Sequence, residues 1–228
     1  MSRGSVGPEE VVPVITQEEA NLARALEGLG HSSASVRLRA ALEVGTAARA
    51  GSAGALIERC AVEPEFFVRD MLTWALTRLP AAVTVPRLLD ALGAQGAQAR
   101  SQALHTLSKI GDRSAWPAIT RELLTDADDT VARSAWRTAV LLVPEDGREG
   151  LARVLASQFG RGGRETRLSL SRAFAALGEE ARPALDTATR DPDPGVREHA
   201  IATERLVRDP ETGFEAAVHE ARRIMVGE

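Results

Sequence analysis

The chain has 228 residues, of which 44% are hydrophobic, enough for a continuous core; only 4% are aromatic, so alanine and leucine must do most of the packing. Both are strong helix formers, and β-branched residues are too sparse to indicate a sheet. The formal net charge of −4 argues against a dedicated nucleic-acid binder, because such proteins are usually basic. The single cysteine, Cys60, excludes an intramolecular disulfide and a thiol-rich zinc site, and its place on an apolar helical face indicates buried packing.

The N-terminal segment, residues 1–16, is polar and rich in glycine and proline, which predicts a flexible tail before a repeat domain over residues 17–228. It has no secretory signal, and no apolar run in the chain is long enough to span a membrane. We therefore expect a cytoplasmic protein without a membrane partner. Helical pattern begins at Thr16, which can cap a helix because Glu19 lies at the capping-box distance.

Six helix pairs are predicted along the chain, with glycine or proline at almost every junction. The first helix of each pair is expected at about 16–29, 52–61, 84–92, 114–124, 147–159 and 180–189. The second helix of each pair is expected at about 35–48, 65–79, 97–110, 130–142, 164–177 and 194–207. A last helix, at about 211–225, has no partner and is expected to cap the stack.

The second helices share a signature near their start, in which a short residue precedes an arginine. It occurs at Val36-Arg37, Val68-Arg69, Ala99-Arg100, Thr166-Arg167 and Val196-Arg197, while Val131-Ala132 holds the same place without the arginine. The second members are 32, 31, 32, 35 and 30 residues apart. Such a repeat predicts a solenoid in which each helix pair buries its apolar face against its neighbours. We interpret the repeating arginines as structural, because residues that define a repeat mostly serve its stacking.

Two further features make the pattern more specific. Three first helices carry a proline near their start, at Pro86, Pro117 and Pro183, and the turns at 126–130 and 191–197 carry paired aspartates. This combination resembles the HEAT repeat, in particular the short bacterial HEAT-like repeats of the phycobilin-lyase type, over residues 17–210. The resemblance implies an all-α fold: a right-handed α-solenoid of about six helix pairs plus a C-terminal capping helix. The other four turns lack the paired aspartates and Ala132 replaces arginine, so we expect an incomplete Asp–Arg ladder between repeats.

Function is expected where the second helices, which should line the concave side, depart from the packing pattern. The positions one and five residues after the signature arginine are four apart and share a helical face. In pairs two to five this face is mostly polar or aromatic. With the adjoining Trp136, it gives the predicted partner-binding site: Asp70, Trp74, Ser101, His105, Arg133, Trp136, Arg137 and Arg172.

These residue types suit a recognition surface, because tryptophan and arginine carry much of the binding energy of interfaces. Phe66 and Phe67 are expected at the mouth of the second pair, where their exposure would mark a binding surface. Each residue also has a structural alternative. The two tryptophans can fill space between repeats, His105 can be solvated or bind a neighbouring aspartate, and the charged residues can form ordinary ion pairs.

Other chemistry is sparse. The four histidines have no metal-binding spacing, and no nucleophile elbow or Cys–His pair is present, so we assign no catalytic residue, metal or cofactor. The segment 160–164 superficially looks like a phosphate loop, but it lacks the Gly-Lys-Ser/Thr sequence and a preceding strand. We predict a flexible turn with two exposed arginines, Arg161 and Arg164.

The leading prediction is a non-enzymatic binding or scaffold module that presents its concave face to a protein segment or an anionic ligand. One alternative is a DNA-binding protein related in architecture to bacterial alkylpurine DNA glycosylases, which would need a continuous basic groove. The net charge and the single lysine, Lys109, argue against tight duplex binding. Another alternative is a chromophore lyase or its escort, which only the repeat type supports. A protein or peptide is the expected partner, and a non-enzymatic role is favoured over catalysis.

Overall fold

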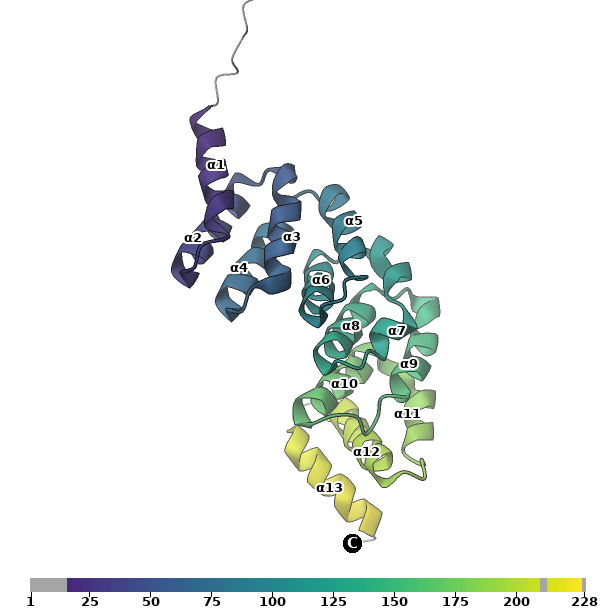
Figure 1. The fold of residues 1–228 in the computed structure, drawn as a ribbon. Coiled ribbons are helices and arrows are strands. Elements are labelled where there is room, and N and C mark those ends of the chain that lie inside the picture. Colours follow the sequence, from purple (N-terminus) through teal and green to yellow (C-terminus); the bar gives the residue numbers. More distant parts are fainter. Residues whose placement is uncertain (1–15, 210–212, 227–228) are drawn as a thin grey trace, which may run out of the picture.

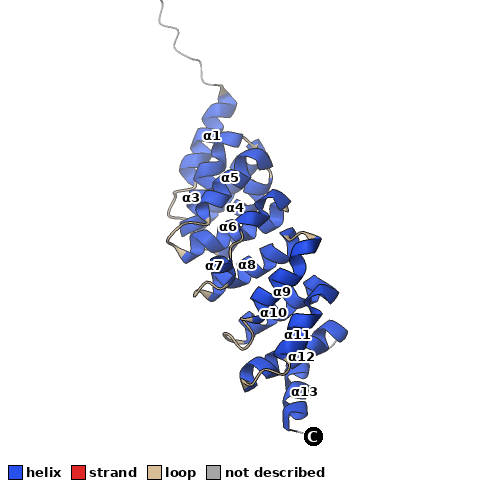
Figure 2. Ribbon diagram, turned by 90° about the vertical axis from the view of Figure 1, so that its right-hand side faces the viewer, coloured by secondary structure: helices blue, strands red, loops and turns tan. Residues whose placement is uncertain are grey.

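A computed structural model describes residues 16–209 and 213–226 of the chain. These residues form helices and turns without a strand (Figure 2), as the sequence predicts. The predicted tail lies outside the described residues apart from Thr16, whose hydroxyl accepts a hydrogen bond from the backbone N–H of Glu19 in a capping box. None of the described helices is long and apolar enough to cross a membrane.

The described chain forms six successive helix pairs and one further helix. The first members are α1 (Gln17–Gly28), α3 (Ala53–Val62), α5 (Ala81–Ala91), α7 (Arg121–Leu124), α9 (Arg148–Ala156) and α11 (Arg182–Ala188). The second members are α2 (Ala34–Ala47), α4 (Phe66–Thr77), α6 (Ala97–Ile110), α8 (Asp129–Leu142), α10 (Arg164–Leu177) and α12 (Pro194–Arg208). The last helix, α13 (Phe214–Val226), packs against α12, in agreement with the predicted cap.

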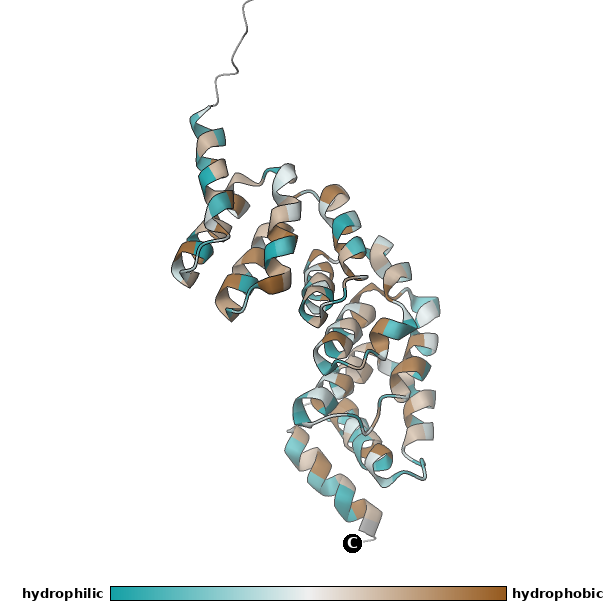
Figure 3. Ribbon diagram, viewed as in Figure 1, coloured by the Kyte–Doolittle hydropathy of each residue, from teal (hydrophilic) through white to brown (hydrophobic). Residues whose placement is uncertain are grey.

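The pairs stack into a curved solenoid. In Figure 1 the second helices, from α2 to α12, lie along the inner side of the curve, and the first helices from α3 to α11 lie along the outer side. Hydropathy alternates around most helices (Figure 3), as expected when one face of a helix packs and the other meets solvent. The predicted placement of the second helices on the concave side is therefore confirmed.

One first helix differs from the prediction. The segment expected as a single helix at 114–124 is a 3₁₀ segment (Arg113–Ala118) followed by the short helix α7. Pro117 lies inside the 3₁₀ segment, where its missing N–H cannot support an α-helical hydrogen bond. Ile119 then leaves the helical region, with φ −83° and ψ 80°. A new helix, α7, therefore begins directly after Thr120.

The hydrophobic core is divided along the solenoid. One cluster of buried residues comes from α1 to α4 and the residues just after them, and a second, larger cluster comes from α5 to α12. A small third cluster joins α12 to α13. The boundary between the two large clusters falls between the second and third repeats. Four leucines of the second helices are fully buried: Leu72, Leu76, Leu107 and Leu177.

The signature arginines close the turns of their own repeats. In four repeats the guanidinium Nη1 donates to two backbone carbonyls, five and six residues earlier, at 2.6–3.3 Å. Arg167 donates in a similar way to the carbonyls of Gly160 and Gly162. Carbonyls that a turn leaves without partners are thus satisfied by one side chain. The structural interpretation of the repeating arginines is confirmed.

The fourth repeat has Ala132 in place of the arginine, and a residue of the next turn supplies the missing contacts. Nη2 of Arg161 donates to the carbonyls of Asp126 at 2.5 Å and Ala127 at 3.1 Å, which lie six and five residues before Ala132. Nε of Arg161 also donates to the carboxylate of Asp129 at 2.8 Å. Arg161 therefore bonds the turn that Ala132 cannot reach.

The loop that carries Arg161 needs two glycines. Gly160 and Gly162 have φ values of 81° and 67°, in the left-handed region that favours glycine. The prediction that Arg161 and Arg164 are both exposed is wrong for Arg161, because its side chain is mostly buried. It holds for Arg164, which is exposed and pairs with Glu215 of α13.

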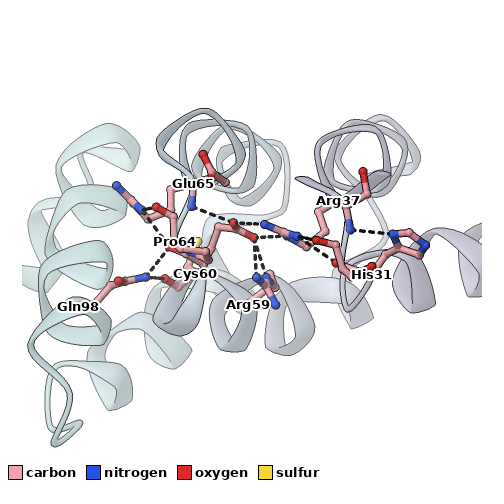
Figure 4. A network of polar contacts seen from close by, with 11 residues as sticks. His31, Arg37, Arg59, Cys60, Pro64, Glu65 and Gln98 are labelled. Carbon is pink, nitrogen blue, oxygen red and sulfur yellow. Dashed lines mark hydrogen bonds and ion pairs between the residues drawn. The ribbon is translucent and has the colours of Figure 1, made fainter. Parts of the chain in front are cut away.

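The first two repeats are joined by a buried ion pair (Figure 4). Arg37 donates twice to the fully buried carboxylate of Glu63, at 2.7 Å each, and Arg59 donates to it at 2.8 Å. Burial raises the pKa of Glu63, but the hydrogen bonds from Arg37, from the backbone of Glu65 and from Arg59 outweigh it and lower the pKa to about 2.

The same turn is also held by the third repeat. Nε2 of Gln98 donates to the carbonyls of Cys60 at 3.0 Å and Glu63 at 2.8 Å (Figure 4). Cys60 is buried as predicted, and burial raises its thiol pKa to about 12. A second signature arginine, Arg100, pairs with Asp126 of the following turn at 2.9 Å. Two signature arginines, Arg37 and Arg100, thus pair with an acidic residue of the next turn. The Asp–Arg ladder between repeats is therefore incomplete, as expected.

Candidate binding groove

An open groove of about 390 Å³ lies on the inner side of the solenoid, between α4, α6 and α8. Five of the eight predicted site residues line it: Asp70, Ser101, His105, Arg133 and Arg137. The other lining residues are Phe66, Arg69, Thr73, Gln102, Lys109, Thr130 and Ser134. Equivalent positions in three successive repeats therefore meet at one concave feature.

Buried hydroxyl groups of α6 and α8 lie at the base of the groove. α6 packs mainly on α8, α3 and α5, and less on α4. The hydroxyls of Ser101 on α6 and Ser134 on α8 lie 3.0 Å apart and are buried at its base. The hydroxyl of Thr138 donates to the carbonyl of Leu104 at 2.9 Å and brings α8 close to α6. The groove is therefore lined by the short hydroxyl side chains of Ser101 and Ser134 together with longer side chains of α6.

The groove is lined by more positive than negative charge. Its basic residues are Arg69, Lys109, Arg133 and Arg137, and its one acidic residue is Asp70. The guanidinium of Arg69 bonds its own turn, and Arg133 lies 3.8 Å from Glu165. Within the described residues, Lys109 and Arg137 have no ion pair. Two cations in the groove are thus available to a ligand.

His105 lies between these charges and is half-buried. Burial lowers the pKa of its imidazole, the positive charges of Arg137 and Lys109 lower it further, and the negative charge of Asp70 partly offsets them. The ring is therefore neutral at physiological pH, with one nitrogen that donates and one that accepts a hydrogen bond. Chemically, the groove offers an anion site beside a neutral imidazole.

Trp136 does not belong to this surface. Its side chain is fully buried, and its indole Nε1 donates to the carbonyl of Leu124 at 2.8 Å. The ring fills space between α8 and the interrupted first helix of the fourth pair, near α7. The prediction that Trp136 adjoins an exposed recognition strip is wrong, and its structural alternative, space filling between helices, is correct.

Trp74 and Arg172 also lie outside the groove. Trp74 remains 37% exposed, but its ring packs over α2, so that a methyl group at Gly45 would lie 2.5 Å from its Cζ3. Arg172 is exposed on α10, one repeat beyond Arg137. The expectation that Trp74, His105 and Arg137 share one groove therefore holds for the latter two only.

Two groove residues extend the predicted set. Lys109 follows His105 by four residues, so one more turn of the same helical face contains it. Phe66 lines the groove and is 64% exposed, and its neighbour Phe67 is 74% exposed. Their rings meet edge to face with centroids 5.6 Å apart. Both are exposed, as the sequence predicts, and Thr73 and Gln102 carried no sequence signal.

The comparisons with known proteins concern the fold. No protein-family model matches the chain, and no curated protein matches its sequence. Similar solved structures include an engineered protein, 17% identical, with a TM-score of 0.47 over 88% of this chain and 97% of that one. Human deoxyhypusine hydroxylase in complex with glycerol is 16% identical, with a TM-score of 0.47 over 92% and 98%. The complex of CpcE and CpcF of phycocyanin lyase from Nostoc sp. PCC7120 is 16% identical, with a TM-score of 0.39 over 98% and 100%.

At these identities the comparisons carry no statement about ligand or activity. The chain's own helix pairs define a HEAT-like repeat architecture, in agreement with the predicted resemblance. The described residues contain no group of three or more histidine, cysteine, aspartate or glutamate side chains placed to hold a metal ion.

Proposed function

We propose that the protein is a binding module that holds an acidic segment of a partner protein in the groove between α4, α6 and α8. The observation that carries this proposal is the pair Lys109 and Arg137, which lack ion-pair partners in the described part of the chain and both act on the pKa of His105. Hydrogen bonds from such cations to a carboxylate are stronger than hydrogen bonds between neutral groups.

The shape of the solenoid supports a segment as the ligand. The second helices line the inner side of the curved solenoid (Figure 1), and extended concave surfaces are what repeat proteins use to bind partners. Hydroxyl groups and the neutral ring of His105 line the groove beside the cations and offer hydrogen bonds to a peptide backbone. A segment with a carboxylate satisfies both kinds of group.

Panning of a random peptide display library tests the proposal. The wild-type protein is compared with the double variant Lys109→Glu/Arg137→Glu and with Arg121→Glu/Arg190→Glu, which makes the same charge change at two exposed arginines outside the groove. Wild type and the Arg121/Arg190 variant should enrich acidic peptides, and the groove variant should not, because its carboxylates repel them.

Equal enrichment by all three proteins would show that the groove does not bind acidic peptides. A parallel gel-shift assay with duplex DNA covers the nucleic-acid alternative. Groove-dependent, strongly salt-sensitive binding of DNA, without enrichment of acidic peptides, would replace the proposal by that alternative.

A further inference from the structure

The two unpaired cations of the groove belong to rows of equivalent positions that continue beyond it. Arg137 lies five residues after the signature position of its repeat, and Lys109 lies nine residues after that of its own repeat. These two positions are one helical turn apart and share a helical face. In a solenoid, equivalent positions of successive repeats lie side by side. The two rows therefore cross the second helices along the inner side of the curve (Figure 1).

The two flanking repeats each add one cation to these rows. Arg78, at the end of α4, is the equivalent of Lys109, and Arg172 on α10 is the equivalent of Arg137. All four side chains are exposed, and none of them has an ion pair within the described residues. Four successive repeats, from the second to the fifth, thus carry one unpaired cation each in the rows.

The rows contain no acid in any of the six repeats. Apart from the four cations and the neutral His105, their members are uncharged: Leu42, Thr46, Trp74, Leu141, Ala176, Ala202 and Leu206. Over the whole chain acids outnumber bases, 32 to 28. Cations without acids therefore do not follow from the composition, and a surface of one sign attracts ligands of the opposite sign.

A role within their own helices explains only two of the four cations. The helix dipole favours a cation in the last turn of a helix, and its effect is limited to that turn. Lys109 and Arg78 lie at such places. Arg137 and Arg172 each lie five residues before the end of their helices. The dipole therefore gives no reason for a cation at these two positions, whereas an anionic ligand does.

The extent of the rows sets the size of the ligand. Packed helices lie about 8–10 Å apart, so the three steps from α4 to α10 cover roughly 24–30 Å. An extended chain spans about 3.3 Å per residue, so about seven to nine residues cross this distance. A single carboxylate in the groove cannot meet the cations at both outer ends. A ligand that uses all four repeats must carry several negative charges.

Building on the proposed function, we infer that the bound segment is a cluster of several acidic residues that crosses the second helices from α4 to α10. Its carboxylates pair with the four cations of the rows. Arg78 and Arg172 are therefore binding residues outside the groove. A protein segment is favoured over nucleic acid, because four cations on a chain of net charge −4 are few for a phosphate backbone.

Fluorescence anisotropy with labelled peptides, titrated to millimolar concentration, tests the inference. Three peptides of ten residues, made of serine and glycine with blocked ends, carry one, two or four evenly distributed glutamates. Affinity should rise about twofold to fivefold with each added glutamate, the range expected for exposed ion pairs. The rise should disappear at high salt, because salt screens exposed charges.

Single substitutions outside the groove locate the contacts. Arg78→Gln and Arg172→Gln should each weaken binding of the four-glutamate peptide about twofold to fivefold. The loss should be smaller for the one-glutamate peptide, which can occupy the groove alone. Arg121→Gln and Arg190→Gln, which remove exposed arginines away from the rows, are matched controls and should change neither affinity. Thermal unfolding of all four variants checks that each one is folded.

The outcomes separate this inference from the proposed function. Wild-type affinity of Arg78→Gln and Arg172→Gln for the four-glutamate peptide, with binding still lost in Lys109→Glu/Arg137→Glu, would confine the site to the groove. The inference would then be overturned and the proposed function would stand. Absence of binding by all three peptides would overturn both. Tighter binding of single-stranded oligothymidine than of the four-glutamate peptide, lost in the same variants, would replace the acidic segment by a nucleic acid.

Discussion

The first two repeats and the last two are joined by different chemistry. Between α2 and α4 the contact combines close backbone packing at Gly45 with the buried ion pair of Arg37 and Glu63. Between α10 and α12 the buried polar contact consists of uncharged groups: the hydroxyls of Ser171 and Thr203 lie 2.7 Å apart, and Ser171 lies 3.2 Å from Nε2 of His199. Arg167 and Glu198 lie 3.8 Å apart at the partly exposed edge of this contact. The same helix pairing therefore tolerates either a buried charge or a buried neutral ring, and the two ends should respond differently to substitution and to acid.

The largest expected effect is at the charged interface. Glu63→Ala removes the acceptor of three guanidinium hydrogen bonds, two from Arg37 and one from Arg59, and leaves Arg37 buried without its counter-ion. Breaking one side of a buried ion pair costs about 3–5 kcal/mol. Urea denaturation of the variant should show this loss of unfolding free energy. The exposed Glu58→Ala in the same repeat is the control, and an equal effect of both would mean that the ion pair contributes nothing specific.

The neutral interface should be sensitive to mild acid. Nδ1 of His199 accepts a hydrogen bond from the backbone N–H of Gly160 at 3.1 Å, so the proton lies on Nε2, which donates to the carbonyl of Arg167 at 2.9 Å. Burial lowers the pKa of His199 to about 4, although the hydrogen bond to Arg167 partly offsets it. The ring fits this place only when neutral.

The folded pKa of His199 lies below the unfolded value of about 6.5, so the unfolded chain binds more protons between the two values. Stability should therefore fall as the pH drops from about 6.5 to about 4, by up to about 3 kcal/mol. Denaturation curves from pH 7 to pH 4 measure this slope. His199→Gln should be less stable at pH 7 but should have a flatter slope, and an unchanged slope would assign the effect to other groups.

Glu63 should change the stability of the protein at lower pH than His199 does. Its folded pKa of about 2 lies below the unfolded value of about 4.3, so its stabilisation is complete above the unfolded value and is lost as the pH falls towards 2. In wild type the loss from His199 should thus begin before the loss from Glu63. A Glu63→Gln variant with the wild-type slope below pH 4 would contradict this order.

The smallest expected effect is the difference in stability between an alanine substitution at a closely packed glycine and one at an open glycine. A methyl group at Gly45 would lie 2.5 Å from the ring of Trp74 and 2.8 Å from Cα of Ala75, so Gly45→Ala must move a backbone. We expect a loss of about 1–3 kcal/mol in thermal or urea unfolding. Gly150→Ala, on helix α9 with nothing within 4 Å, should instead gain up to about 1 kcal/mol from helix propensity. Equal effects at both glycines would show that α2 and α4 are not in close contact.

The two tryptophans show how far the sequence predicts the site. Trp74 is five residues after its signature arginine and Trp136 is four after Ala132, and one residue rotates a helical position by about 100°. All side chains at the earlier position are buried: Ala41, Thr73, Leu104, Trp136, Ser171 and Ile201. The repeat spacing therefore contained the information that Trp136 is a core residue.

Two features of the structure, the helix break at Pro117 and the ion pair of Glu63, could not be predicted from the local sequence pattern. The helix pairs followed from the repeat, because the signature marks each second helix to within a few residues. The break at Pro117 was not predicted, since proline is tolerated in the first turn of a helix and only the tertiary structure shows where that turn lies. Glu63 was overlooked because its turn lacks the paired aspartates, although a glutamate makes the same contact one carbon further out.

The substitution by Arg161 has a consequence for how this chain can change. The fourth and fifth repeats are separated by 35 residues, the longest step in the chain, and the loop with Arg161 lies within it. The fourth repeat lacks its own turn-bonding arginine, and Arg161 of the fifth repeat supplies these hydrogen bonds. Deleting or exchanging the fifth unit alone would open a turn in the fourth. We therefore expect the fourth and fifth repeats to be exchangeable only together, and a shuffling experiment should cut outside them.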